Sequence, residues 1–179
     1  MTIRLRIISA EDDDFLREIE ISGDATFLEL HHFIQKTLNF DPSQMASFFT
    51  TDDAWHKDKE ITLMDMAIEE SDASLIMSET TLKQLLSDKK QRMIYTFDFF
   101  NDRNLFIEMD KISHSECPKP KCTQEKGNAP EQLDMSSLLE ATMGESSATK
   151  KNLPYDDDFG DDDDFNDPLI SYTDDLDDY

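Results

Sequence analysis

The chain of 179 residues contains little glycine and cysteine, and each scarcity argues against a class of site. Its four glycines are dispersed at Gly23, Gly127, Gly144 and Gly160. This is too few for a glycine-rich loop that cradles phosphate groups or a dinucleotide. The nucleophile elbow G-x-S-x-G is also absent from the sequence. We therefore expect no cofactor, and we can identify no small-molecule substrate.

Basic residues are scarce, at 17 Lys+Arg against 41 Asp+Glu, which gives a formal net charge of -24. A surface of this charge repels nucleic-acid phosphate and anionic lipid, so we expect neither direct nucleic-acid binding nor membrane binding. No apolar run approaches the roughly 18 residues of a membrane span. The acidic residues from Glu11 to Asp14 lie where a signal peptide would need an apolar stretch. These features predict a cytoplasmic protein.

The two cysteines, Cys117 and Cys122, form a C-x4-C pair that could supply half of a zinc site. A tetrahedral structural site needs four ligands, and His114 is the only close candidate for a third. Cytosolic thiols are normally kept reduced. We therefore predict two free loop cysteines and no bound metal.

The charge is concentrated at the C-terminal end. Residues 155–179, here called the acidic segment, contain twelve aspartates and no basic residue, which is half of the net charge. Such a segment cannot bury enough apolar surface to offset the entropy of ordering. The sequence predicts a folded core over 1–112, a Pro/Lys/Cys linker over 113–132, a short helix over 133–144 and a disordered Asp-rich tail over 145–179.

Within 1–112 the hydrophobic periodicity predicts an α+β fold. Alternating apolar residues around Leu5 and Ile19 indicate an antiparallel hairpin. The T-x-x-E capping box at Thr26 begins a helix that ends before Asp41-Pro42, and short strands follow. A second capping box, at Thr81, opens a short helix, and a second hairpin follows over 92–112. This order is typical of a β-grasp-like core.

Several short motifs occur in a definite order along the chain. They are Leu16-Arg17, the run from Gly23 to His31, Phe40-Asp41, the run from Tyr95 to Phe99, and Gly127 with Pro130 and Glu131. In these motifs the chain resembles the plasmid open-reading-frame-three-like family, named after a root-inducing plasmid. The resemblance implies a fold and a mobile-element context, since members occur on plasmids, on chromosomes and as insertion-element passengers. It implies no established activity.

The chain also departs from the pattern of that family. After the aromatic-Asp-Phe motif the family continues Gly-Asp-x-Trp-x-His, and these positions hold Phe100, Asn101, Arg103 and Leu105. Gln44 stands where the turn after the helix usually has a histidine. A set of polar residues that could form a site has become apolar or neutral here.

Two polar residues within the matched motifs are candidates for a site. His31 falls on the helical arc of Phe27, Ile34 and Leu38, so we interpret it as a core or boundary histidine that makes one hydrogen bond. Asp98 precedes a tight turn, where a carboxylate commonly accepts backbone N–H groups. The alternative is a divergent enzyme that uses His31, Asp98 and neighbouring residues, with His31 as a candidate general base.

The acidic segment offers the clearest functional pattern. Its aspartates are interrupted by apolar residues that could anchor a partner, among them Phe159, Phe165, Tyr172 and Tyr179. This composition suits docking to a basic groove that accepts aromatic groups. The leading hypothesis is a non-catalytic adaptor or accessory protein with a basic protein partner. The alternatives are a merely solubilising tail, a DNA mimic or mobile-element accessory protein that acts on a nucleic-acid enzyme, and the divergent enzyme.

Overall fold

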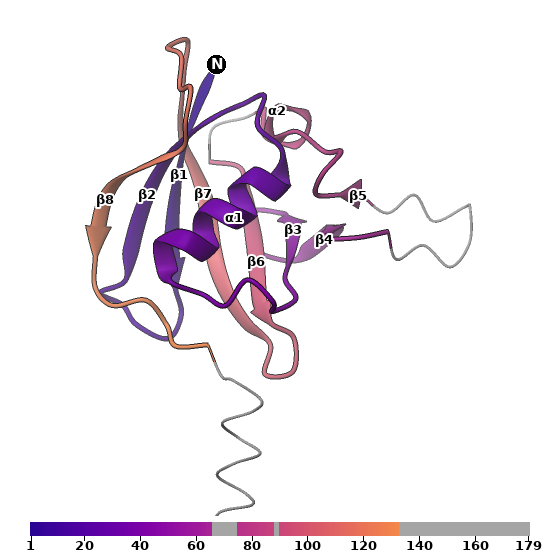
Figure 1. Cartoon of the computed structure of the whole chain (residues 1–179), viewed down its shortest axis with the longest axis vertical. Helices are drawn as coiled ribbons and strands as arrows, with labels where there is room; N and C mark the ends of the chain where they lie inside the picture. The colour runs from indigo at the N-terminus through magenta and orange to yellow at the C-terminus, as the bar shows by residue number, and fades with distance from the viewer. Residues whose placement is uncertain (66–74, 88–89, 133–179) are drawn as a thin grey trace, which may run out of the picture. The chain divides into compact units, whose positions relative to one another are not determined.

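The computed structural model of the chain describes residues 1–65, 75–87 and 90–132 (Figure 1). The elements are β1 (Thr2–Ser9), β2 (Leu16–Ser22), α1 (Phe27–Leu38), β3 (Ser47–Thr51), β4 (Lys57–Thr62), β5 (Leu75–Ile76), α2 (Leu82–Leu85), β6 (Arg92–Asp98), β7 (Arg103–Ser113) and β8 (Lys121–Lys126). The strands form one sheet in the order β5-β4-β3-β6-β7-β1-β2-β8. α1 lies across one face of this sheet (Figure 1). The predicted α+β fold class is confirmed.

The first predicted hairpin is formed by β1 and β2, which pair antiparallel. Their inward-facing apolar side chains are at most 1 % exposed: Ile3, Leu5, Ile7, Ile19 and Ile21. On the opposite face Arg4 and Glu20 form an ion pair at 2.6 Å, and Arg6 and Glu18 form another at 3.2 Å. Strand alternation therefore separates the apolar and charged residues, as the sequence pattern predicts.

The second predicted hairpin is formed by β6 and β7, with the turn at residues 99–102. β7 also pairs antiparallel with β1, which joins the two hairpins into one sheet. On its other side β6 pairs with β3, and Phe48 lies opposite Tyr95. The long central strands β6 and β7 therefore connect the N-terminal and middle parts of the chain.

α1 begins at the predicted capping box. The Glu29 N–H donates to Thr26 Oγ1 at 3.2 Å, and the Thr26 N–H donates to Glu29 Oε2 at 2.8 Å. The helix ends at Asn39, which adopts the left-handed conformation with φ 56. Its inward face packs on the sheet, with the ring centroids of Phe27 and Phe48 5.3 Å apart.

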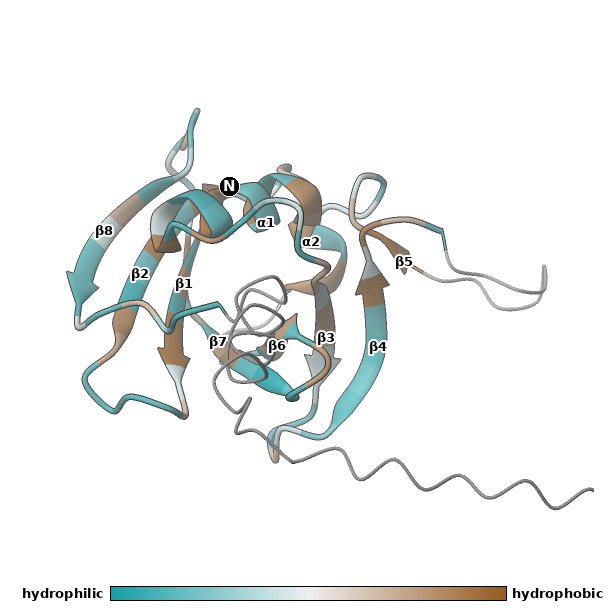
Figure 2. Cartoon of the chain, turned by 60° about the horizontal axis from the view of Figure 1, so that its bottom comes forward, coloured by the Kyte–Doolittle hydropathy of each residue, from teal (hydrophilic) through white to brown (hydrophobic). Residues whose placement is uncertain are grey.

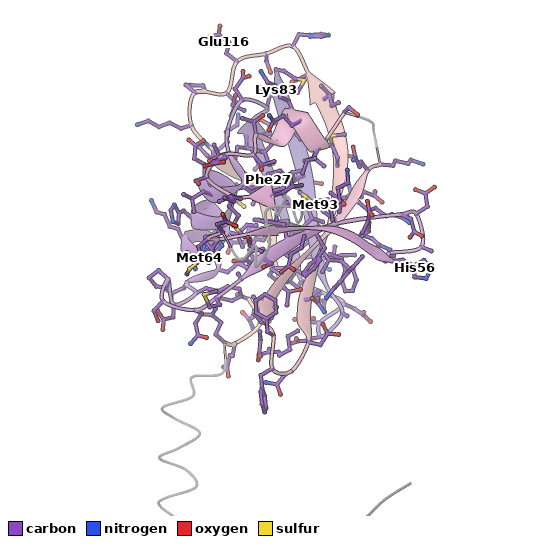
Figure 3. All side chains as sticks on the ribbon, turned by 90° about the vertical axis from the view of Figure 1, so that its right-hand side faces the viewer. Phe27, His56, Met64, Lys83, Met93 and Glu116 are labelled. Atoms are coloured by element: carbon purple, nitrogen blue, oxygen red, sulfur yellow. The ribbon has the colours of Figure 1, made fainter. Side chains whose placement is uncertain are left out.

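The hydrophobic core lies between α1 and the sheet. Phe27 of α1 and Met93 of β6 are at most 1 % exposed and lie in the interior, whereas His56 and Met64 lie at the periphery (Figure 3). β4 is hydrophilic along most of its length and hydrophobic at its end, where Ile61 is fully buried (Figure 2). Only part of this strand therefore contributes to the core.

The short helix α2 closes the core beside the start of α1. Gln84 Oε1 accepts a hydrogen bond from the Thr81 N–H at 2.7 Å, as expected of the second capping box. The Leu82 N–H donates to the carbonyl oxygen of Ala25 at 2.9 Å, and Leu82 is fully buried. The second helix prediction is therefore confirmed.

The segment predicted as a linker differs from that expectation. Residues Lys121–Lys126 form β8, which pairs antiparallel with β2 at the edge of the sheet. The described residues all belong to one compact unit, Met1–Leu139, so the folded unit continues beyond Ile112. The prediction of a loop is wrong for β8, because its polar sequence pairs through backbone groups that composition does not reveal.

Two of the sequence predictions concern residues that the structure does not describe. The short helix over 133–144 and the disordered tail over 145–179 lie outside the described residues. None of the helices in the described part of the chain combines the length and apolar character that crossing a membrane requires.

Candidate functional site

Three segments that are far apart in the sequence meet at one end of the sheet. They are the turn after α1 (residues 39–44), the turn between β6 and β7 (residues 99–102) and the chain after β8 (residues 127–132). Each segment contains or adjoins a motif that resembles the plasmid family. We take this end of the domain as the candidate functional site.

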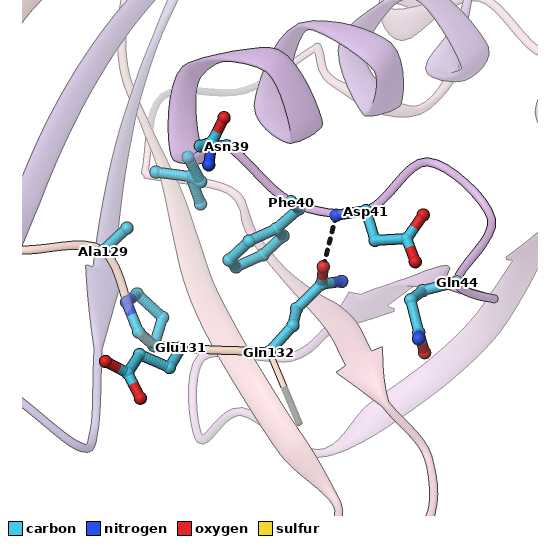
Figure 4. A pocket seen from close by; sticks show the side chains of 9 residues that line it. Asn39, Phe40, Asp41, Gln44, Ala129, Glu131 and Gln132 are labelled. Carbon is cyan, nitrogen blue, oxygen red and sulfur yellow. Dashed lines mark hydrogen bonds between the residues drawn. The ribbon is translucent and has the colours of Figure 1, made fainter. Parts of the chain in front are cut away.

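A groove of about 440 Å³ lies between the turn after α1 and the chain after β8 (Figure 4). It is lined by Leu38, Asn39, Phe40, Asp41, Gln44, Ala129, Pro130, Glu131 and Gln132. The lining contains two acidic residues, Asp41 and Glu131, and no basic residue. Its electrostatics therefore favour a cationic or neutral group over an anionic one.

Direct contacts hold the walls of the groove together. The Asp41 N–H donates to Gln132 Oε1 at 2.5 Å across the groove (Figure 4). Asp41 Oδ1 accepts the Ser43 N–H at 2.8 Å, which stabilises the turn. Phe40 is 7 % exposed, and its ring centroid lies 5.1 Å from that of Phe97 in β6. The groove is therefore attached to the hydrophobic core.

Arg103 fixes the β6–β7 turn against its surroundings. Its Nε and Nη2 donate to the Glu11 carboxylate at 2.8 and 2.6 Å, and its Nη1 donates to the carbonyl oxygen of Glu131 at 2.6 Å. The guanidinium also lies 5.0 Å from the centroid of the Phe97 ring. The hydrogen bond from Arg103 holds the pKa of Glu11 below its ordinary value. This bidentate geometry defines the position of the turn.

The same turn presents two aromatic side chains to solvent. Phe99 is 48 % exposed and Phe100 is 87 % exposed. Asp98 accepts two hydrogen bonds from Asn101, from its N–H at 3.0 Å and from its Nδ2 at 2.8 Å. Sequence reasoning predicted the turn of the second hairpin at residues 100–103 and noted Phe100 and Asn101 as departures from the family pattern, but it did not single out Phe100 as an exposed side chain. The position of a phenylalanine within a predicted hairpin turn was the available signal of its exposure.

Arg17 is a buried residue that sequence reasoning also missed. Its side chain is 3 % exposed, and its Nη1 and Nη2 donate to the carbonyl oxygens of Lys126 and Gly127 at 2.6 and 3.1 Å. Its guanidinium lies 4.7 Å from the centroid of the Phe15 ring. Arg17 shares the inward face of β2 with Ile19, so strand alternation could have predicted its burial. It attaches the end of β8 to β2.

Gly127 allows the chain after β8 to enter the groove. Its φ is +68, and a Cβ there would lie 2.7 Å from the carbonyl oxygen of Asp14. A side chain is therefore excluded by both conformation and space. This glycine belongs to the motif that precedes Pro130 and Glu131.

His31 lies in the core, as predicted. It is 2 % exposed, and its Nδ1 is 2.9 Å from the hydroxyl of Tyr95, the donor being set by the histidine tautomer. Burial, with a smaller contribution from the neighbouring His32, lowers the pKa of His31 to about 4. Burial also raises the pKa of Tyr95 above its ordinary value. The imidazole is therefore neutral near pH 7 and shielded from solvent.

Asp98 lies at the end of β6, and its carboxylate stabilises the turn as predicted. Burial alone would raise the pKa of Asp98, but hydrogen bonds from Asn101 and from the Phe100 backbone outweigh it and lower the pKa. Among the described residues His31 bonds to Tyr95 and Asp98 bonds within its turn, so the structure does not bring the two candidates together.

The other candidates have no ligand or catalytic geometry in the described part of the chain. Cys117 and Cys122 are free thiols, and Cys122 lies on β8, where burial raises the pKa of its thiol. No group of three His, Cys, Asp or Glu side chains is arranged to hold a metal ion within residues 1–65, 75–87 and 90–132. Phe159, Phe165, Tyr172 and Tyr179 lie outside the described residues.

A known protein family matches the part of the chain that contains the candidate site. The sequence profile of the plasmid pRiA4b ORF-3-like protein family matches residues 1–137. The chain belongs to this family. The match includes all three segments that meet at the candidate site and β8. No curated protein matches the chain.

A solved structure has a similar fold. The crystal structure of a protein of unknown function from Methanosarcina mazei Go1 superposes with a TM-score of 0.56 and 19% identity. The similarity covers 84% of this chain and 83% of that chain. At this identity it supports the fold alone, so a function must be inferred from the residues of the site and from the charge of the chain.

Proposed function

We propose that the protein is a non-catalytic, cytoplasmic accessory or adaptor protein that binds a basic protein partner through its acidic segment. The observation that carries this proposal is the distribution of charge. The acidic segment has twelve aspartates and no basic residue in 25 residues, whereas the preceding 154 residues have 29 acidic and 17 basic residues. Phe159, Phe165, Tyr172 and Tyr179 provide aromatic anchors within this anionic segment.

The pairing of the arginines in the folded domain is consistent with a basic partner. All five arginines form ion pairs with carboxylates: Arg4–Glu20, Arg6–Glu18, Arg17–Glu125, Arg92–Glu108 and Arg103–Glu11. An arginine that is held by a carboxylate is poorly placed to bind phosphate, because its donors and its charge are already engaged. The folded domain therefore has no surface of unpaired arginines in its described residues that could attract an anionic partner.

The geometry gives little support to the divergent enzyme. His31 is 2 % exposed and hydrogen bonded to Tyr95. Asp98 is engaged by Asn101 in a separate turn. A general acid and base must reach the same reacting atoms, and these two groups have different partners in different elements.

A DNA mimic is also less favoured by the described surface. Such a protein needs rows of carboxylates that are free to imitate phosphates. Here Glu20 is bound by both Arg4 and Lys121, and Asp14 is bound by Lys126. These two carboxylates are therefore engaged by cations of the domain itself.

The proposal is tested by capture from a native lysate at several salt concentrations. Three baits are compared: the full chain, residues 1–154, and a variant in which Phe159, Phe165, Tyr172 and Tyr179 are all replaced by Ser. We expect the truncation to lose most of the captured basic protein and the Ser variant, which keeps the charge, to lose a large part. Binding by the full chain should weaken toward roughly 0.5 M salt, where the Debye length is only a few Å.

Equal capture of the same protein by all three baits would refute a role for the acidic segment. Capture of a nucleic-acid enzyme by residues 1–154, in competition with duplex DNA, would instead support the DNA mimic.

A further inference from the structure

The β6–β7 turn and the acidic segment share a short sequence. Residues 98–102 read Asp-Phe-Phe-Asn-Asp, and residues 163–167 read Asp-Asp-Phe-Asn-Asp. Both therefore contain the pattern D-x-F-N-D, in which a phenylalanine precedes Asn-Asp. The same side-chain chemistry occurs once in the folded domain and once in the segment assigned to partner binding.

The copy in the folded domain is accessible. Phe100 is 87 % exposed and is the most exposed large hydrophobic side chain among the described residues. Phe99 beside it is 48 % exposed. Burial of such a phenylalanine in an apolar pocket of another molecule removes its surface from water, which is favourable. The turn therefore presents an anchor residue at the candidate site.

The turn is also held in one conformation. Asp98 accepts two hydrogen bonds from Asn101, and Asn104 Nδ2 donates to the backbone and side-chain oxygens of Asp102 at 2.7 and 3.1 Å. Lys57 forms an ion pair with Asp102 at 3.3 Å. Arg103 attaches the base of the turn to Glu11. A preformed anchor loses less conformational entropy on binding than the same sequence in a flexible chain.

We propose that the β6–β7 turn is a second docking element for the basic partner of the acidic segment. Phe100 enters an apolar pocket of the partner, and basic side chains at the rim of that pocket face Asp41 and Glu131 in the lining of the neighbouring groove. The chemistry assigned to the partner rests on the proposed function. Because the turn and the acidic segment belong to one chain, binding at one raises the effective concentration of the other.

The electrostatics of the neighbouring groove agree with a basic partner. Glu131 and Asp41 lie in its lining without any basic residue, and Arg103 at the start of β7 donates a hydrogen bond to the carbonyl oxygen of Glu131. The two cations beside the turn, Lys57 and Arg103, are each paired with a carboxylate, so the acidic lining of the groove is the charge that remains for a partner. A partner surface with Lys or Arg around an aromatic-accepting pocket is complementary to this end of the domain.

The test uses the full chain labelled with ¹⁵N and a defined probe, an amidated hexapeptide of alternating arginine and tryptophan. Backbone amide signals of residues 99–102 and of residues 155–179 are followed separately during the titration. We expect both sets to shift and saturate. The Phe100→Ser variant should weaken binding at the turn by about fivefold or more, because the anchor is lost, and should leave the 155–179 titration nearly unchanged.

Met64→Ser is the matched control, since Met64 is another hydrophobic side chain that is 57 % exposed. It should change neither titration, and thermal unfolding should show that both variants fold like the parent. Turn amides that do not shift, or that titrate equally in Phe100→Ser and the parent, would overturn the proposal. Failure of the 155–179 amides alone to respond would count against the proposed function and leave the turn as the binding element.

Discussion

His31 and Arg17 place polar side chains on the inward faces of α1 and β2, and each makes a hydrogen bond to a distant strand, although the buried Nε of Arg17 has no hydrogen-bond partner among the described residues. His31 is 2.9 Å from the Tyr95 hydroxyl, while Arg17 donates to the carbonyl oxygen of Lys126 at 2.6 Å. Buried polar groups cost free energy unless they are hydrogen bonded. Both residues therefore tie a distant strand to their own element.

The buried His31 should make stability depend on pH. Its folded pKa of about 4 lies below the ordinary value of 6.5, so the unfolded chain binds this proton at a higher pH than the folded chain. Stability should consequently fall as the pH decreases from about 6.5 toward 4. We expect a loss of about 2 kcal/mol between pH 7 and pH 5, measured by urea unfolding.

Two glutamine variants provide the comparison for this pH dependence. His31→Gln removes the titration and should flatten most of the change between pH 7 and pH 5. His32→Gln alters the exposed neighbour and should retain it. Identical pH profiles for the two variants would show that His31 is not responsible.

Gly127 should be intolerant of a side chain. Gly127→Ala places a Cβ 2.7 Å from the backbone oxygen of Asp14 at a positive φ, so we expect a loss of about 2 kcal/mol or more in thermal or urea unfolding. Gly23→Ala is the control, because its Cβ would meet the flexible end of Met1. That variant should lose less than about 1 kcal/mol. Similar losses at the two positions would contradict this account of Gly127.

At the scale of elements, the structures predicted best were those with local signals. Apolar alternation indicated the β1–β2 and β6–β7 hairpins, and the Thr26 capping box indicated the start of α1. β8 has no such signal, since five of its six residues are exposed and the other, Cys122, is half-buried. It forms because β2 offers an unpaired edge and Arg17 binds the carbonyl oxygens at its end.

Hydrogen exchange can show whether β8 is a stable strand. Backbone amides of β8 that bond to β2 should exchange more slowly than those in residues 114–119, because strand pairing must open before they exchange. Arg17→Lys should reduce this protection by removing the forked contacts to Lys126 and Gly127, whereas Arg6→Lys on the outer face should not. Exchange of β8 at the rate of residues 114–119 in the parent would show that the strand is not stably formed.

At the scale of the whole molecule, the candidate site could be predicted only in part. The motif segments were recognisable in the sequence, but their meeting depends on tertiary contacts such as the Asp41–Gln132 hydrogen bond, which joins residues 91 positions apart. The exposure of Phe100 likewise depends on how Arg103 and Asp98 hold the turn. Local patterns contain no information about which distant segments become neighbours.

Folding and partner binding should be separable. Deletion of residues 155–179 removes half of the net charge, and exposed charges contribute little to stability. The free energy of unfolding in urea should change by no more than about 1 kcal/mol on this deletion. A much larger loss would mean that the acidic segment is part of the folded unit.

The most direct test of the central claim is transfer of the acidic segment to an unrelated carrier protein. Capture of the basic partner by this fusion is compared with capture by a fusion in which Phe159, Phe165, Tyr172 and Tyr179 are Ser and every aspartate is retained. The account predicts that the parent segment captures the same partner as the full chain and that the Ser version captures much less. No capture by the parent segment, with full capture by residues 1–154, would contradict it.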